Sequence, residues 1–270
     1  NGFNLNLDFT YFISTESEVR YGLQVSGYST SLDLITPNNF FSQIDHSTDF
    51  AAYIDYNLSK NRFVFNPGFR FQNYTSLGEN RLEPRLSLKY NMSEKIRLKA
   101  SGGTFSQNLI STNDDTDVVS LFTGFLSSTD NIPSTFQNSE INSLLQTATH
   151  YVIGLEYDIL NNLNINIEGY FKKFNQLIGL NRNKIYEDIP EFSSQLDFLK
   201  KDFMIERGDA RGIDFLLKYN SKKVSIWSVY SFGLVNREDE LQVYSPHYDR
   251  THNFNFVFSY VMDRKKLWDL

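Results

Sequence analysis

The sequence predicts an all-β protein, specifically an antiparallel up-and-down transmembrane β-barrel. Three observations support this: apolar residues recur with a period of two, short turns alternate with long polar loops, and the polar face of the strands carries full charges. Aromatic residues make up 16% of the 270 residues. No segment approaches the roughly 20 consecutive apolar residues that a membrane-spanning helix requires. Helical membrane spans are therefore excluded.

Alternation begins at the start of the chain, where Phe3, Leu5 and Leu7 are separated by Asn4 and Asn6. The same alternation marks further apolar faces over 19–25, 50–58, 63–71, 82–90, 96–100, 151–159, 163–171, 213–219 and 254–260. Another strand is predicted over 224–236, where the pattern does not decide which face is apolar. Several runs last about twelve residues or more, whereas globular strands usually have about five or six. The sequence therefore predicts about eleven long strands.

The connections between these strands alternate in length. Short turns are predicted at 14–17, 59–61, 93–95, 161–162, 221–223 and 263–266. Longer polar loops are predicted at 33–47, 75–80, 108–149, 181–202 and 238–251. This alternation is typical of outer-membrane barrels, which have turns on the periplasmic side and loops outside. Greek-key connections in a soluble sandwich would not maintain it.

The polar face of the strands indicates a wet interior. It carries full charges such as Arg85, Lys99 and Glu156, whereas the opposite face is rich in Phe, Leu, Ile and Tyr. Small barrels fill their interiors with apolar side chains, so a charged interior requires a wide lumen that holds water or a polar plug. A large soluble sandwich with its polar face in water is the alternative. The length of the strands favours the barrel.

Tyrosines also lie near the predicted strand ends, where an amphipathic ring can sit at the level of the lipid headgroups. These girdle candidates are Tyr11, Tyr90, Tyr157 and Tyr260.

Composition excludes several classes of function. The absence of cysteine excludes disulfides, thiolate metal sites and a cysteine nucleophile. A net charge of -6 with interspersed signs argues against a nucleic-acid partner, which requires clustered Lys and Arg. There is neither a nucleophile elbow nor a glycine-rich phosphate loop. No catalysis and no cofactor are predicted.

The histidines near the C-terminal end offer a weak alternative. His247 and His252 flank Asp249 and Arg250, a spacing that allows a metal or acid-base site. The favoured interpretation is that these residues order the junction between a loop and a strand.

Four aspartates in the 108–149 loop superficially suggest calcium. The run 113–117 lacks the glycine and the terminal glutamate of an EF-hand, so a solvated acidic loop is the default and no metal is predicted. The four residues are Asp114, Asp115, Asp117 and Asp130.

Five sequence motifs resemble those of TonB-dependent outer-membrane receptors, and they occur in that family's order. They are EPRLSL at 83–88, KASGGTFSQ at 99–107, HYVIGLE at 150–156, EGYFKKFNQLI at 168–178 and YDRTHNF at 248–254. The last is the most specific, because it looks like the D-R-T-H-x-hydrophobic start of a late barrel strand. In it, Asp249, Arg250 and His252 are expected to be structural.

The resemblance implies a barrel of roughly 22 strands with a plugged lumen, energised through TonB. Residues 1–270 are then expected to form part of the barrel domain, about 11–12 strands, with no plug domain, no TonB-interaction segment and no closing aromatic strand among them. The implied location is the outer membrane. The implied partners are outer-membrane lipid and the TonB complex, with a surface lipoprotein or another envelope protein as a further candidate.

The expected function is import of a bulky nutrient such as a siderophore, a glycan or a peptide. Luminal charges are the candidate ligand contacts, against the alternative that they only solvate the lumen or pair with a plug. These residues are Arg70, Arg85, Lys99, Glu156, Glu168 and Lys172. Two other functions are weighed: a non-transporting barrel subunit that docks partner proteins through its outer loops, and a complete small barrel acting as a passive pore or lipid-modifying enzyme.

Overall fold

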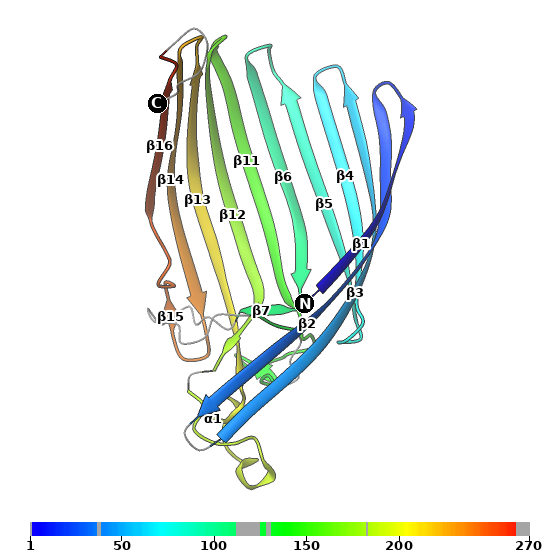
Figure 1. The fold of residues 1–270 in the computed structure, drawn as a ribbon, viewed down its shortest axis with the longest axis vertical. Helices are drawn as coiled ribbons and strands as arrows, with labels where there is room; N and C mark the ends of the chain where they lie inside the picture. Colours follow the sequence, from blue (N-terminus) through cyan, green and yellow to red (C-terminus); the bar gives the residue numbers. More distant parts are fainter. Residues whose placement is uncertain (1, 37–38, 112–124, 128–130, 182, 263–270) are drawn as a thin grey trace.

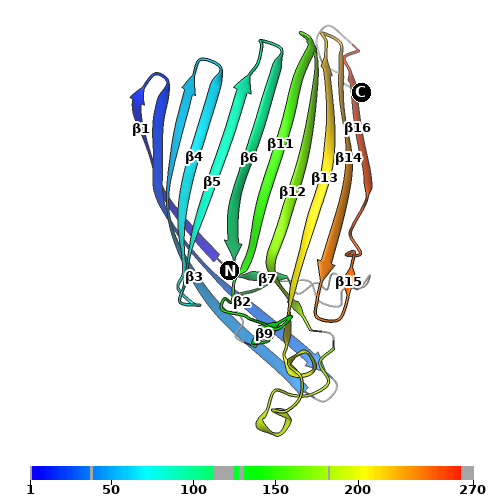
Figure 2. The same ribbon diagram turned by 180° about the vertical axis from the view of Figure 1, so that it is seen from behind.

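The protein forms one large antiparallel sheet that curls into an open wall (Figures 1 and 2). The computed structural model describes residues 2–36, 39–111, 125–127, 131–181 and 183–262. The 12-stranded sheet consists of β1 (Gly2–Ser14), β2 (Ser17–Thr36), β3 (Asn39–Lys60), β4 (Phe63–Tyr74), β5 (Glu79–Asn91), β6 (Ile96–Gln107), β11 (Gln146–Leu160), β12 (Leu163–Leu180), β13 (Phe203–Asn220), β14 (Val224–Glu238), β15 (Val243–Tyr244) and β16 (His252–Tyr260).

Small elements fill two of the connections. They are β7 (Leu109–Ser111), β8 (Phe125–Ser127), β9 (Thr135–Phe136), β10 (Ser139–Glu140), the 3₁₀ helix η1 (Pro190–Phe192) and α1 (Asp197–Lys200). Among the described residues, no helix is long and apolar enough to cross a membrane.

Neighbouring strands of the main sheet follow one another along the chain, except that β6 pairs with β11 across the segment that contains β7 to β10. At the C-terminal end, β14 pairs with both β15 and β16. This order confirms the predicted up-and-down topology, and the strands predicted from alternation are all present.

The short and the long connections lie at opposite rims, at the top and the bottom of Figure 1 respectively. The turn predicted at 263–266 lies outside the described residues. The loop predicted at 33–47 is corrected: β2 continues to Thr36, β3 begins at Asn39, and the hairpin projects beyond the rim. Backbone pairing needs no apolar face once a hairpin has left the lipid, so the polarity of this segment does not exclude a strand.

The polar side chains face the inside of the curve. Tyr53 of β3 donates a hydrogen bond to Asp8 of β1 (2.6 Å), and Arg70 of β4 donates one to Gln24 of β2 (2.7 Å). Each bond bridges strands that are two apart, and such side chains converge only on a concave face. Gly22 of β2 permits the first, because a Cβ at that position would lie 2.7 Å from both Asp8 and Tyr53.

The convex face is apolar and exposed. Large side chains such as Phe3, Leu5, Ile153 and Phe254 remain 60–68% exposed in the isolated chain. A soluble protein would bury so extensive a surface, whereas a barrel wall covers it with lipid. The sequence left open which face of β14 is apolar. Phe232 pairs in register with Ile213, which faces outward, so Phe232 also lies on the convex face.

The predicted girdle tyrosines lie on this convex face, towards the short-turn rim. They are Tyr11, Tyr90, Tyr157 and Tyr260, and the ring of Tyr90 packs 4.7 Å from that of Phe63.

The buried apolar core lies at the other rim, within the long connections. Phe136 (0% exposed), Ile110, Ile178 and Ile205 belong to it, and Arg207 covers the ring of Phe136 at 4.8 Å. We call this unit the loop lobe: the described parts of the β6–β11 and β12–β13 connections, 108–111, 125–127, 131–145, 181 and 183–202, with the adjoining strand ends.

Candidate functional site: the luminal wall and its outer mouth

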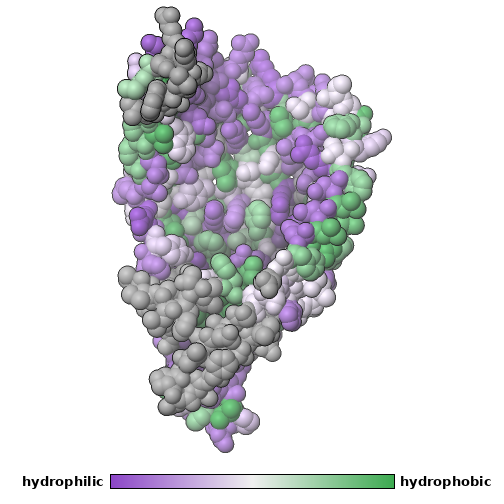
Figure 3. Space-filling view, viewed as in Figure 1, coloured by the Kyte–Doolittle hydropathy of each residue, from purple (hydrophilic) through white to green (hydrophobic). Residues whose placement is uncertain are grey.

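The six charged residues predicted for the lumen all lie on the concave face, which Figure 3 shows as largely hydrophilic. Strand register aligns Arg85, Gly103, His150 and Lys172 in one row across the wall. Two rows nearer the short turns, Lys99 and Glu168 lie in register through Gly154 and line a shallow hollow of about 320 Å³. The sequence therefore identifies the inward-facing charges correctly. Whether they contact a ligand remains a prediction.

Most of these charges already have partners within the wall. Glu156 pairs with Lys99 at 2.8 Å and with Arg97 at 3.0 Å, and Arg97 also pairs with Asp158 at 2.6 Å. Arg70 donates to Gln72 at 3.0 Å in addition to its bond to Gln24. Sequence reasoning did not single out Arg97 or Asp158, although both follow the same alternation. This part of the wall satisfies its own charges.

Arg85 belongs to a cluster of cationic and aromatic side chains on the concave face. It pairs with Glu83 at 2.8 Å and lies over the ring of Phe105 at 4.9 Å. Phe105 contacts the ring of His150, with the centroids 4.6 Å apart. Glu83 is only 4% exposed and also accepts bonds from the backbone and the hydroxyl of Ser106, each 2.7 Å long.

A deeper pocket of about 440 Å³ lies where the luminal wall meets the loop lobe, and we call it the mouth pocket. Its walls come from the outer ends of β6, β11, β12 and β14, from the start of β13, and from β7, β8 and the β15–β16 connection. Aromatic, aliphatic, amide and charged side chains converge there. The central lining residues are Gln107, Gln146, Phe174, Glu206, Arg237 and Tyr248.

Arg237 and Glu206 form the polar centre of the mouth pocket. Their side chains are 11% and 10% exposed, and Arg237 Nη1 lies 3.7 Å from Glu206 Oε2. Arg237 also donates to the hydroxyl of Tyr248 at 3.0 Å and covers the ring of Phe174 at 4.8 Å. Tyr244 donates to Glu206 at 2.9 Å. Both charges are thus held in place by aromatic residues from three different segments.

A bulge in β12 shapes the pocket. The register with β13 shifts between Phe174 and Leu177, so Phe174 pairs with Gly208 and Leu177 with Glu206. Of the residues in between, Gln176 donates to the carbonyl of Ser143 at 2.7 Å. Bulges re-aim side chains and bend a strand. Here the bulge directs Gln176 towards Ser143, and this hydrogen bond connects the luminal wall to the loop lobe beside the mouth pocket.

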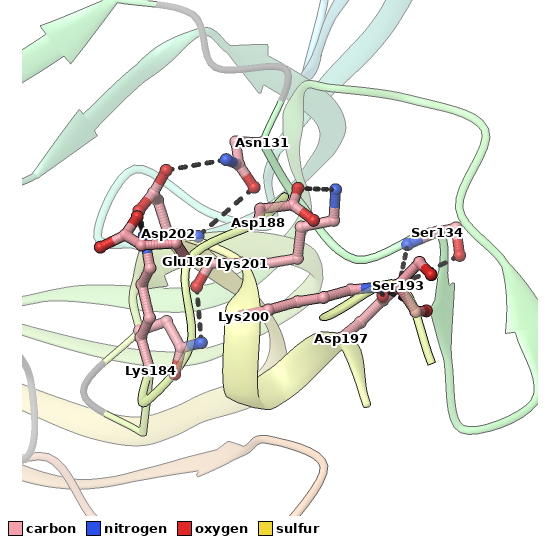
Figure 4. A network of polar contacts seen from close by, with 11 residues as sticks. Asn131, Ser134, Lys184, Glu187, Asp188, Ser193, Asp197, Lys200, Lys201 and Asp202 are labelled. Atoms are coloured by element: carbon pink, nitrogen blue, oxygen red, sulfur yellow. Dashed lines mark hydrogen bonds and ion pairs between the residues drawn. The ribbon is translucent and has the colours of Figure 1, made fainter. Parts of the chain in front are cut away.

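Polar contacts hold the two connections of the loop lobe together (Figure 4). Asn131 donates to Asp202 at 2.8 Å, and the backbone N–H of Ser134 donates to Asp197 at 3.2 Å. Lys184 also pairs with Asp202, at 2.7 Å. The lobe is therefore an ordered unit in its described parts.

Two charges in the loop lobe have shifted pKa values. Partial burial disfavours the charge of Lys184, but hydrogen bonds to Asp202 and Glu187 outweigh it and raise the pKa of Lys184 above its usual value. A hydrogen bond from Lys201 holds the pKa of Asp188 below its usual value. Both shifts favour the charged forms at neutral pH.

The YDRTHNF motif at 248–254 lies where the β15–β16 connection enters the sheet. His252 is the first residue of β16, and its Nδ1 lies 2.8 Å from the hydroxyl of Tyr230 on the convex face. The backbone N–H of Asp249 donates to the carbonyl of Pro246 at 2.9 Å, and Arg250 follows it. These contacts fit a structural role at a loop-to-strand junction.

Within the part of the chain that the structure describes, no group of three or more acidic or histidine residues could hold a metal ion. Of the aspartates weighed for calcium, Asp114, Asp115, Asp117 and Asp130 all lie outside the described residues.

Comparison with solved structures shows the same fold at low sequence identity. The FrpB iron transporter from Neisseria meningitidis matches with a TM-score of 0.61 and 11% identity, covering 97% of this chain and 40% of that one. The siderophore receptor PirA from Acinetobacter baumannii matches with a TM-score of 0.65 and 9% identity, covering 97% and 40%. The RagAB peptide importer in its 'closed-closed' state matches with a TM-score of 0.51 and 10% identity, covering 88% and 30%. The chain thus spans less than half the length of each.

No curated protein matches the chain. The family model described as "TonB dependent receptor-like, beta-barrel" matches residues 1–265. Because this match covers nearly the whole sequence, the chain belongs to the β-barrel family of TonB-dependent receptors, which are outer-membrane receptors and transporters rather than enzymes.

Proposed function

We propose that this chain forms part of a barrel that imports a bulky nutrient across the outer membrane, driven by TonB. The mouth pocket carries the proposal, because it places a largely buried Arg237–Glu206 pair among aromatic and amide side chains where the lumen meets the loop lobe. Concave sites with a few fixed polar groups are typical of ligand binding. We propose a siderophore, a glycan or a peptide as the nutrient.

The proposal places the 270 residues within one barrel domain. It assigns the other strands, a plug and the TonB-interaction segment to the rest of a longer protein. The supporting observation is that this chain covers 40% of the matched FrpB chain. The luminal charges are then proposed to contact either the passing nutrient or the plug.

Uptake by the full-length receptor tests this proposal. Deleting its gene should abolish growth on one nutrient, and loss of TonB should stop uptake while surface binding persists. Arg237→Gln should lower binding and uptake at limiting nutrient by at least about tenfold, since the guanidinium supplies charge-assisted hydrogen bonds. Lys218→Gln, on the exposed luminal wall near the short turns, is the matched control. Unchanged growth on every siderophore, glycan and peptide source would contradict import.

A second function is favoured by the exposed apolar tip of the loop lobe. Ile185 is 73% exposed and Leu196 61% exposed, and both lie in the β12–β13 connection that projects beyond the rim. We propose as the alternative a barrel subunit that docks a surface lipoprotein or another envelope protein through this lobe. Stoichiometric co-purification that Leu196→Asp abolishes, with uptake absent, would favour docking over import.

A further inference from the structure

The convex face of β11 to β14 carries a groove with a positive charge at one end. Its volume is about 480 Å³, and its walls include Tyr151, Ile153, Phe171 and Ile213. Gly169 creates the depression, because it lies in register between Ile153 and Ile213 and offers no side chain to fill the space. This groove is on the opposite face of the sheet from the mouth pocket.

Arg211 lies at the end of the groove nearer the long loops. It is paired in register with Phe171 on one side and Leu234 on the other, both of which face outward. Alternation along β13 therefore points Arg211 away from the lumen, as it does Ile213 and Phe215. Arg211 is exposed and forms no ion pair or side-chain hydrogen bond with any described residue.

The surrounding charges leave this cation available. Lys173 lies one row further towards the loops and is exposed, and Asp209 pairs with it in register. Asp209 lies two positions before Arg211 on the same face of β13, so Lys173, Asp209 and Arg211 together place one net positive charge at the upper edge of the apolar belt. From Leu163 to Phe171 the belt spans nine residues of β12, whose eight steps give a rise of roughly 26 Å along the strand. A strand tilt of about 40° reduces this length to a height of roughly 20 Å, which lies within an apolar band about 25 Å tall.

We propose that the groove binds one acyl chain of an outer-leaflet lipid whose phosphate-bearing headgroup pairs with Arg211. The apolar walls suit the chain, and the gap at Gly169 lets it lie close to the sheet. An arginine at headgroup height matches the charge and the geometry of a phosphate. An uncompensated charge on the lipid face is otherwise unfavourable, and a phosphate partner removes that cost.

Native mass spectrometry of the full-length receptor in detergent tests this lipid site. The probes are an acylated disaccharide lipid with two phosphates and the same lipid without phosphate. Arg211→Gln should reduce retention of the phosphorylated lipid at least fivefold and leave retention of the unphosphorylated lipid unchanged. Gly169→Leu, which fills the groove, should reduce retention of both lipids.

Lys60→Gln is the matched control, because Lys60 is an exposed cation at the short-turn rim. It should retain both lipids as the unaltered receptor does. The proposal is overturned if Arg211→Gln retains the phosphorylated lipid normally, or if Lys60→Gln loses as much of it as Arg211→Gln. If Gly169→Leu does not insert into the membrane, the proposal is still tested by comparing Arg211→Gln with the unaltered receptor.

Discussion

Glu206 and Arg237 set the chemistry of the mouth pocket, and each depends on the other. Removing one member of a largely buried pair leaves the second charge poorly compensated. Because the two groups are 3.7 Å apart and Arg237 keeps its contacts with Tyr248 and Phe174, we expect a moderate effect. Arg237→Gln or Glu206→Gln alone should each lower stability by about 2 kcal/mol.

A double-mutant cycle on the purified full-length receptor measures this coupling. The double variant should be less destabilised than the sum of the single variants. Strict additivity in thermal unfolding would show that the two side chains do not interact.

Sequence reasoning found the luminal charges but not this pair. Arg70, Arg85 and Lys172 follow regular alternation, which predicts a face without tertiary information. Glu206 and Arg237 lie 31 positions apart: Glu206 precedes the strand predicted at 213–219 by seven positions, and Arg237 directly follows the one predicted at 224–236. Pairing of β13 with β14 brings them together, and the bulge in β12 re-aims the strand beside them. Neither feature has a local sequence signal.

Acidity should loosen the loop lobe through Asp188. Its pKa is lowered in the folded protein, so its contribution to stability is present above the unfolded value of 3.8 and is lost as pH falls through the folded pKa. Lys201→Gln removes the hydrogen bond that causes most of the shift, so the variant lobe should be less stable above the unfolded value of 3.8 and should lose less stability as the pH falls. Limited pepsin digestion of the lobe between about pH 2 and 5 measures it. An identical pH profile for both proteins would contradict the assignment.

The loop lobe is the element whose stability depends on an apolar core. Phe136 is fully buried there, so Phe136→Ala should destabilise the lobe by about 3–5 kcal/mol through lost burial and a residual cavity. Hydrogen exchange should rise over 131–145 and 181–202, while the membrane-spanning parts of β12 and β13 stay protected. Ile185→Ala is the control, because Ile185 is 73% exposed. Equal exchange in both variants would show that the core does not hold the lobe.

Alternation predicts strands well where one face meets lipid and the other meets water, as in β4, β12 and β16. It fails beyond the membrane, where both faces of a strand can be polar. The extended β2–β3 hairpin was therefore expected to be a loop over 33–47, and β7 to β10 were not anticipated. The small elements of the lobe depend on contacts between distant connections, such as Asn131 with Asp202.

At the scale of the whole molecule, the order of the strands and their two faces define the protein. The sheet follows chain order, its concave face holds paired charges, and its convex face exposes large apolar side chains. This arrangement requires lipid outside and a polar lumen inside. The motif order predicted the family, and the match over residues 1–265 confirms it. Alternation does not identify the nutrient, because nutrient specificity depends on how the lobe and the mouth pocket are shaped in three dimensions.

The two-faced wall is tested most directly by single cysteines along β12 in the full-length receptor, since this chain contains no cysteine of its own. Nitroxide labels at 165 and 167 should collide mainly with lipid-soluble oxygen, because Ile165 and Ile167 face outward. Labels at 166 and 168 should collide mainly with a water-soluble nickel complex, because Asn166 and Glu168 face the lumen. Accessibility that does not alternate between neighbouring positions would contradict a barrel wall with lipid on one side and a polar lumen on the other.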